Sequence, residues 1–134
     1  MKIRTDFVTN SSSSSFLIAY REPKNFSETS SFLSRIIEEI LMYEDYMTDE
    51  TTVIHTQEDL QKMLKEQCYY RSEEELYEEG GRFADAYAKA KEYISAGFTV
   101  YYKNIDSCND TLPHFIHLLN EEYQNFVILL DGDM

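Results

Sequence analysis

Residues 6–20 read DFVTNSSSSSFLIAY, in which a run of five serines lies between two apolar segments. Serine-rich linkers usually have polar flanks, because a solvated chain gains nothing from apolar neighbours. Here Phe7 and Val8 precede the serines and Phe16-Leu17-Ile18 follow them, so both flanks have the character of strands that enter a core. The stretch therefore predicts that Ser11–Ser15 is a connection within one fold and not a domain boundary.

The pairing of this region has two interpretations. Ile3, Thr5 and Phe7 alternate with polar neighbours, which is typical of a short strand. If Ser11–Ser15 turns the chain back, this strand and Phe16–Tyr20 form an N-terminal hairpin with a long loop. In the alternative, the serines form a partly ordered loop, and Phe16–Tyr20 is the first strand of the sheet.

The N-terminal text MKIRTDFVTNSSSSSF resembles a signature of small proteins from Gram-positive bacteria and their phages, to which no activity is attached. The resemblance implies a bacterial or phage origin and transfers no catalytic residue. A separate hypothesis is that residues 1–16 are an address or a modification site that another protein reads.

The composition is that of one globular domain. The chain has 134 residues, of which 43% are hydrophobic, and a chain of this size buries a core without metals or disulfides. Cys68 and Cys108 have no CxxC spacing, and the N-terminus lacks the pattern of a secretory signal, so the expected compartment is the cytoplasm. No apolar run approaches the roughly 18 residues of a membrane-spanning helix.

The formal net charge of −13 restricts the partners of the chain. Binding to phosphate backbones or to anionic membrane surfaces depends on Lys and Arg, so neither is expected. The electrostatic field of this negative charge favours a protein partner with a basic surface. Acidity that serves only solubility is the simpler interpretation.

Apolar residues three and four positions apart predict amphipathic helices. The clearest begins after Ser27, its expected N-cap, and runs to about Tyr46. Its expected inward residues are Phe32, Leu33, Ile36, Ile37, Ile40 and Leu41. Further helices are expected after Thr56, which forms a capping box with Asp59, and from Arg82 to a left-handed cap at Gly97. The last expected helix starts at Ser107 or Asn109, with Leu112, Phe115, Ile116 and Leu119 inward. Residues 73–79 are expected to form only a solvated, weakly held helical segment.

Strands are expected at Phe16–Tyr20, Thr51–His55, Phe98–Lys103 and Phe126–Leu130. The last is the most hydrophobic run, and we place it in the sheet interior because such strands are covered on both faces. The passage from Gly97 directly into a strand indicates the second half of a βαβ-type unit. The alternation predicts one α/β domain over residues 1–134, with a mixed sheet of four to five strands and about four helices.

Carboxylates follow two of the expected strands. Asp106 lies just beyond one strand, and Asp131 and Asp133 lie just beyond Phe126–Leu130. If the two strands are parallel neighbours, these side chains converge at their carboxyl ends and could hold Mg²⁺. The simpler interpretation is that Asp and Gly only end the strands.

Cys108, His114 and His117 form a second candidate metal site. The two histidines are three positions apart on an expected helix and share a face, and Cys108 precedes that helix. A fourth ligand, such as His55 or Asp106, has to come from elsewhere. A Cys/His nucleophile pair is a further interpretation, but no orienting acid is identifiable. Histidines on a surface helix are the simpler alternative.

The serine run is a candidate anion-binding or recognition loop. It comprises Asn10, Ser11, Ser12, Ser13, Ser14 and Ser15. Successive backbone N–H groups can cradle a phosphate. However, no glycine, Walker lysine or directly following helix is present, which favours a structural or recognition role.

An acidic patch is expected on the helix over 73–79, formed by Glu73, Glu74, Glu75, Glu78 and Glu79. It could face a basic partner, and a solvated helix face explains the same residues without a partner.

The motifs of common enzyme classes, GxGxxG, GxSxG, HExxH and the EF-hand loop, do not occur in the sequence. The sequence therefore predicts an acidic cytoplasmic protein of bacterial or phage origin with a non-catalytic role in protein interaction. The rival hypothesis is a metal-dependent phosphoesterase or nucleotide-handling enzyme that uses Asp106 and Asp131.

Overall fold

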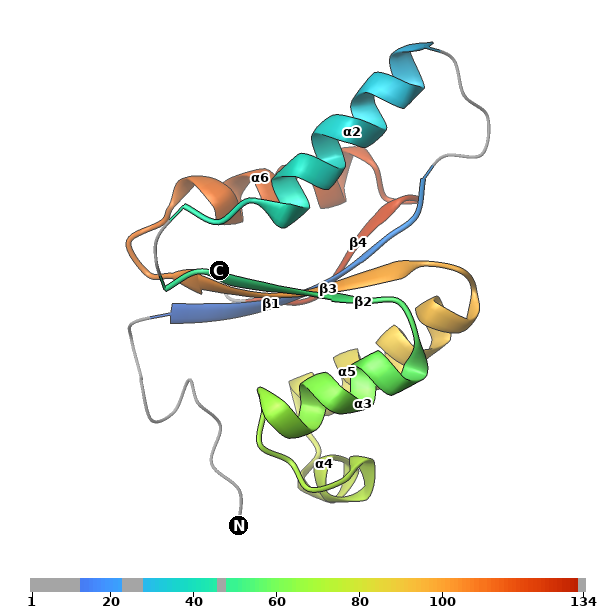
Figure 1. Ribbon diagram of the computed structural model, residues 1–134, viewed down its shortest axis with the longest axis vertical. Coiled ribbons are helices and arrows are strands. Elements are labelled where there is room, and N and C mark those ends of the chain that lie inside the picture. Colours follow the sequence, from blue (N-terminus) through green and yellow to red (C-terminus); the bar gives the residue numbers. More distant parts are fainter. Residues whose placement is uncertain (1–12, 23–27, 46–47, 133–134) are drawn as a thin grey trace.

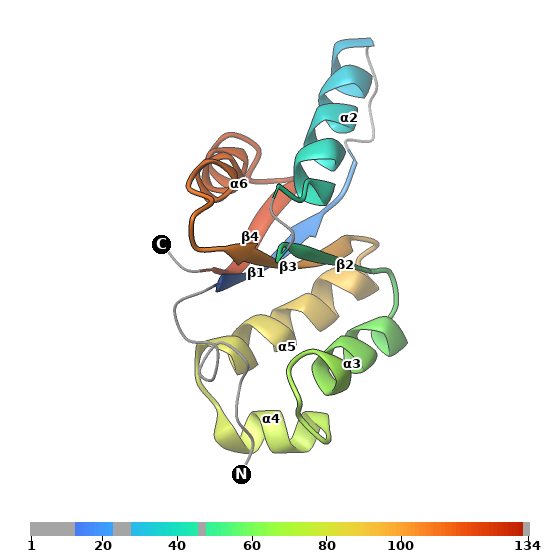
Figure 2. The same ribbon diagram turned by 60° about the vertical axis from the view of Figure 1, so that its left-hand side comes forward.

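A four-stranded sheet forms the middle layer of the molecule, and helices cover both of its faces (Figures 1 and 2). The computed structural model describes residues 13–22, 28–45 and 48–132. Along the chain the elements are β1 (Ser13–Tyr20), α2 (Glu28–Met42), β2 (Glu50–Ile54), α3 (Gln57–Glu66), α4 (Glu73–Glu79), α5 (Arg82–Ser95), β3 (Thr99–Asp106), α6 (Thr111–Glu122) and β4 (Val127–Gly132). Helices α2 and α6 lie on one face, and α3, α4 and α5 lie on the other (Figure 2).

The strand order is β2-β3-β1-β4, and every neighbouring pair is antiparallel. The predicted α/β domain is confirmed. The prediction of a mixed sheet is wrong for the described strands, and so is the βαβ-type unit, because β2 and β3 are antiparallel neighbours. The described residues form five helices, where about four were expected. The N-terminal hairpin involves residues outside the described ranges.

Strand β1 begins inside the serine run. Ser13, Ser14 and Ser15 pair with Asp106, Ile105 and Asn104 of β3. The prediction that Ser11–Ser15 is entirely a connection is therefore wrong for its last three residues. β3 extends to Asp106, and this length gives the serines a partner strand that local sequence preference does not reveal.

Strand β4 lies at the edge of the sheet, so the prediction of an interior position is wrong. Its apolar run is nevertheless covered on both faces. Val127 and Leu129 pack in the core beneath α2 and α6, whereas Ile128 and Leu130 pack against the core beneath α5. A continuous apolar run thus indicates that helices cover both faces of a strand. It does not indicate that the strand has a neighbouring strand on each side.

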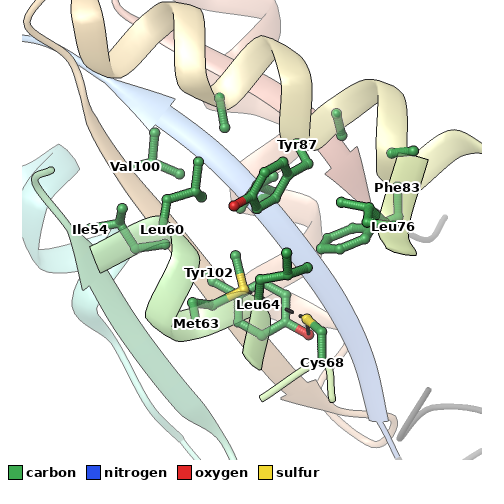
Figure 3. Close-up of a cluster of buried hydrophobic side chains, with 14 of the residues drawn as sticks. Ile54, Leu60, Met63, Leu64, Cys68, Leu76, Phe83, Tyr87, Val100 and Tyr102 are labelled. Carbon is green, nitrogen blue, oxygen red and sulfur yellow. Dashed lines mark hydrogen bonds between the residues drawn. The ribbon is translucent and has the colours of Figure 1, made fainter. Parts of the chain in front are cut away.

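The larger core lies between the sheet and α3, α4 and α5. Figure 3 shows Leu60, Leu64, Leu76 and Tyr87 converging there from three helices, and each is fully buried. The second core lies between the sheet and the helices α2 and α6, and it contains Phe16 and Ile18 of β1. Leu17 and Ala19 of the same strand belong to the larger core, because successive side chains of a strand point to opposite faces of the sheet.

Two helix boundaries follow directly from their sequence signals. Thr56 and Asp59 form the expected capping box at the start of α3. Gly97 has φ of +95° just after α5, in the left-handed region that favours glycine. The expected N-cap Ser27 lies outside the described residues. Within the described part of the chain, no helix is both long and apolar enough to cross a membrane.

Candidate functional site

The two strand-end carboxylates do not converge, because β1 lies between β3 and β4. Asp106 accepts a hydrogen bond from Thr48 Oγ1 at 2.6 Å and another from the backbone N–H of Cys108 at 2.8 Å. These bonds, with that of Thr48 the stronger influence, lower the pKa of Asp106. Asp131 forms a salt bridge of 2.9 Å with Arg82. The condition for a shared Mg²⁺ site is therefore not met by these two residues, and Asp133 lies outside the described residues.

The Cys/His cluster is only partly assembled. His114 is exposed on α6, His117 is half-buried with its ring edge-on to Phe16, and the thiol of Cys108 is exposed. Neither imidazole is hydrogen-bonded to a carboxylate of the described residues. Across the same residues, no three His, Cys, Asp or Glu side chains are grouped so that they could hold a metal ion.

Several sequence candidates nevertheless line one hollow of about 540 Å³, which we call the β3-end hollow: Ser14, Asp106, His114 and His117. Its lining also includes Asp110 and Glu121 and contains no Lys or Arg, so it is electronegative. The buried Nε2 atom of His117 has no hydrogen-bond partner among the described residues. The remaining candidates of the serine run, Asn10, Ser11 and Ser12, lie outside the described residues. The hydroxyl group of Ser15 binds the neighbouring strand, since its Oγ donates to Asn104 Oδ1 at 2.7 Å.

The predicted acidic patch is divided between structural and solvent-facing residues. Glu73 accepts hydrogen bonds from Tyr87 and Lys91, and Glu79 accepts one from Tyr70. Glu75 pairs with Arg71. Only Glu74 and Glu78 point to solvent without a side-chain partner in the described residues, so most of the patch holds α4 in place.

A second hollow was not predicted from the sequence. It is a groove of about 740 Å³ between α2 and α6, which we call the α2–α6 groove. Its apolar lining consists of Phe32, Ile36, Ile40, Tyr43, Leu112 and Phe115, and its charged lining consists of Arg35, Glu39 and Asp45. In Figure 2 the N-terminal end of α2 rises away from the sheet and from α6.

Two aromatic side chains that were expected to point inward lie in this groove. Phe32 is 63% exposed and Phe115 is 45% exposed, whereas Ile37 and Leu41 of the same apolar face of α2 are buried. The apolar face of α2 is wider than the stripe that the sheet covers. This excess of apolar positions is the signal in the sequence that could have indicated the groove.

Buried polar contacts fix the end of the groove that is lined by Asp45 and Asn109. Asp49 is 5% exposed and accepts hydrogen bonds from the backbone N–H groups of Asp45 and Asp106, at 2.9 and 2.7 Å. Its Oδ2 also accepts from Asn109 Nδ2 at 3.4 Å, and Asn109 Oδ1 in turn accepts from the N–H of Leu112. The end of α2, the end of β3 and the start of α6 are thereby joined, so this part of the groove is preformed.

Comparison of the chain with protein-family models, with curated proteins and with solved structures finds no match.

Proposed function

We propose that this chain is an acidic, non-catalytic cytoplasmic protein of bacterial or phage origin that binds another protein through the α2–α6 groove. The observation that carries the proposal is the exposure of Phe32 and Phe115 from two different helices into one groove. Contiguous exposed apolar surface with a charged margin is typical of protein-binding sites, and aromatic residues dominate the binding energy of such sites.

The charge of the chain indicates the kind of partner. A net charge of −13 attracts a basic surface and accelerates its approach. Glu39 and Asp45 place part of this charge on the margin of the groove itself. Binding is therefore expected to weaken as salt concentration rises, because exposed charges are screened.

Site-specific photo-crosslinking in the native host tests this proposal. A photoreactive amino acid replaces Phe115 in one variant and Phe32 in another, and exposed Lys62 of α3, on the opposite face, is the control position. We expect both groove positions to capture the same protein, which mass spectrometry identifies, and the control position to capture none of it. Equal capture at all positions, or capture only of a second copy of this chain, overturns the proposal.

A further inference from the structure

Building on the proposed function, we infer that the occupant of the α2–α6 groove is an amphipathic helix of the partner, with its basic end over Glu39 and Asp45. The inference rests on three features of the groove: its length, the backbone groups that surround it and the distribution of its charges.

The apolar lining has the dimensions of a short helix. From Phe32 to Tyr43, the residue just past the end of α2 at Met42, the lining advances by eleven positions, which at the helical rise corresponds to about 16 Å or about three turns. Phe32, Ile36 and Tyr43 recur along this length, and Phe115 contributes from the side of α6. A helix with apolar residues at i, i+4, i+7 and i+11 presents anchors over the same length.

The walls of the groove favour a helical occupant over an extended one. Both walls are helices, whose interior backbone groups are hydrogen-bonded within their own element. An extended segment would find no ladder of backbone partners there, and unpaired buried N–H and C=O groups are costly. A helix satisfies its own backbone and needs only side-chain contacts from the groove.

The exposed edge of the sheet next to α6 is also unsuited to strand addition. Along β4, the N–H of Val127 donates to the carbonyl oxygen of Tyr123 at 2.8 Å, and that of Leu129 donates to Asn120 Oδ1 at 2.9 Å. The residues at the end of α6 thus occupy donors that an added strand requires. Strand addition at this edge does not compete with the groove.

The charges give the occupant a direction. Arg35 lies in the half of the groove near Phe32, whereas Glu39 and Asp45 lie toward the end of α2. A partner helix with Lys or Arg at one end matches this distribution when that end lies over the carboxylates. A second copy of the chain is a poorer occupant, because two molecules of net charge −13 repel each other.

Selection of 16-residue peptides displayed on phage, against the full chain, tests the inference. We expect enriched peptides to carry apolar residues at helical spacing and Lys or Arg at one end. Phe115→Ser should weaken their binding at least about tenfold, measured by fluorescence anisotropy of the synthetic peptide. A proline placed at the centre of the peptide should weaken binding by a similar factor, since it breaks the helix.

Charge reversal tests the direction. Glu39→Lys with Asp45→Lys should weaken the basic peptide about tenfold and should favour a peptide whose basic end is changed to Glu. Glu74→Lys with Glu78→Lys is the matched control, because it changes the net charge equally at exposed positions of α4. An equal loss in both double variants overturns the assigned direction.

The outcomes separate this inference from the proposed function. Groove-binding peptides that tolerate the central proline overturn the helical occupant and leave the proposed function standing. If no selected peptide responds to Phe115→Ser, the inference is overturned, and capture of a partner at Phe115 by crosslinking then decides the proposed function by itself.

Discussion

The Nζ atom of Lys103 lies 2.6 Å from the carbonyl oxygen of Leu41 in the last turn of α2, and the lysine is only 1% exposed. The same ammonium group donates to the carbonyl oxygen of Tyr43 at 3.0 Å and to Thr51 Oγ1 at 2.6 Å. Carbonyl groups at the end of a helix lack partners within the helix and carry partial negative charge. A buried lysine of β3 therefore binds the carbonyl groups at the end of α2 and holds Tyr43, which lines the α2–α6 groove, in place.

The stability of the protein should depend on the ionisation of Lys103. Burial lowers its pKa to about 8 from an ordinary value of 10.5, against the opposing influence of Glu44 and Asp49. Between these values the unfolded chain holds a proton that the folded protein has released, so a rising pH favours folding. We expect the free energy of unfolding in urea to rise by on the order of 1 kcal/mol between about pH 8 and about pH 9.5.

Two variants identify the source of this rise. Lys103→Met should remove it, and Lys62→Met, at an exposed position of α3, should retain it. The measurement stops below about pH 10, where tyrosines of the unfolded chain begin to ionise. Burial raises the pKa of Tyr101 to about 12, so that residue stabilises the unfolded state as the pH rises further. An identical pH dependence in Lys103→Met and the unaltered protein would contradict the assignment.

The sequence predicts those parts of the fold that depend on local signals. The capping box of Thr56 and Asp59 needs only neighbouring residues, and α3 begins where it was expected. Strand order depends on contacts between distant segments, so an apolar run such as Phe126–Leu130 could be recognised as a strand but not placed at the edge.

The candidate site shows the same division. His114 and His117 could be grouped from their spacing, and they do line one hollow. The α2–α6 groove could not be predicted, because whether a groove exists there depends on the position of α2 relative to the sheet and to α6. Lys103 helps to set that position by binding the carbonyl oxygen of Leu41 at the C-terminal end of α2. The two residues are 62 positions apart in the sequence, and no local pattern indicates such a contact.

Removing the hydroxyl group of Tyr87 should loosen α4 from α5. This hydroxyl donates to Glu73 Oε2 at 2.7 Å, and Lys91 forms a salt bridge of 3.1 Å with Oε1 of the same carboxylate. Burial alone would raise the pKa of Glu73, but the contacts with Tyr87 and Lys91 outweigh it and lower the pKa. Tyr87→Phe should lower the free energy of unfolding at neutral pH by about 1–2 kcal/mol.

Acid unfolding followed by circular dichroism checks the cause. The lowered pKa of Glu73 contributes stability above its ordinary pKa, and this contribution is lost as the pH falls through the folded value. Tyr87→Phe should therefore move the acid midpoint to higher pH. Tyr77→Phe is the control, because Tyr77 is exposed and packs edge-on against the same ring. A midpoint that moves equally in both variants would contradict the role of the Glu73 contact.

A methyl group at Gly132 should destabilise the edge of the sheet. A Cβ atom built there lies 2.5 Å from Cδ2 of Phe16, its partner across the β1–β4 pair. Gly132→Ala should therefore cost about 1–3 kcal/mol through overpacking. In a double-mutant cycle, Phe16→Leu should recover part of that cost, because the shorter side chain vacates the contact. Additive effects of the two substitutions would show that overpacking against Phe16 is not the cause.

Replacing Tyr69 with glycine should stabilise the protein. Tyr69 has φ of +62°, and among the described residues it is the only one besides glycine with positive φ. Its neighbours Cys68 and Tyr70 are each 2% exposed, so burial on both sides holds the exposed tyrosine in this strained conformation. Tyr69→Gly should raise the free energy of unfolding by about 1 kcal/mol, since glycine adopts positive φ without a Cβ clash.

Tyr69→Ala removes the ring but keeps Cβ, so it should give no such gain in the same urea titration. If alanine stabilises the protein as much as glycine does, the gain comes from removing an exposed ring, and backbone strain at residue 69 is not its source.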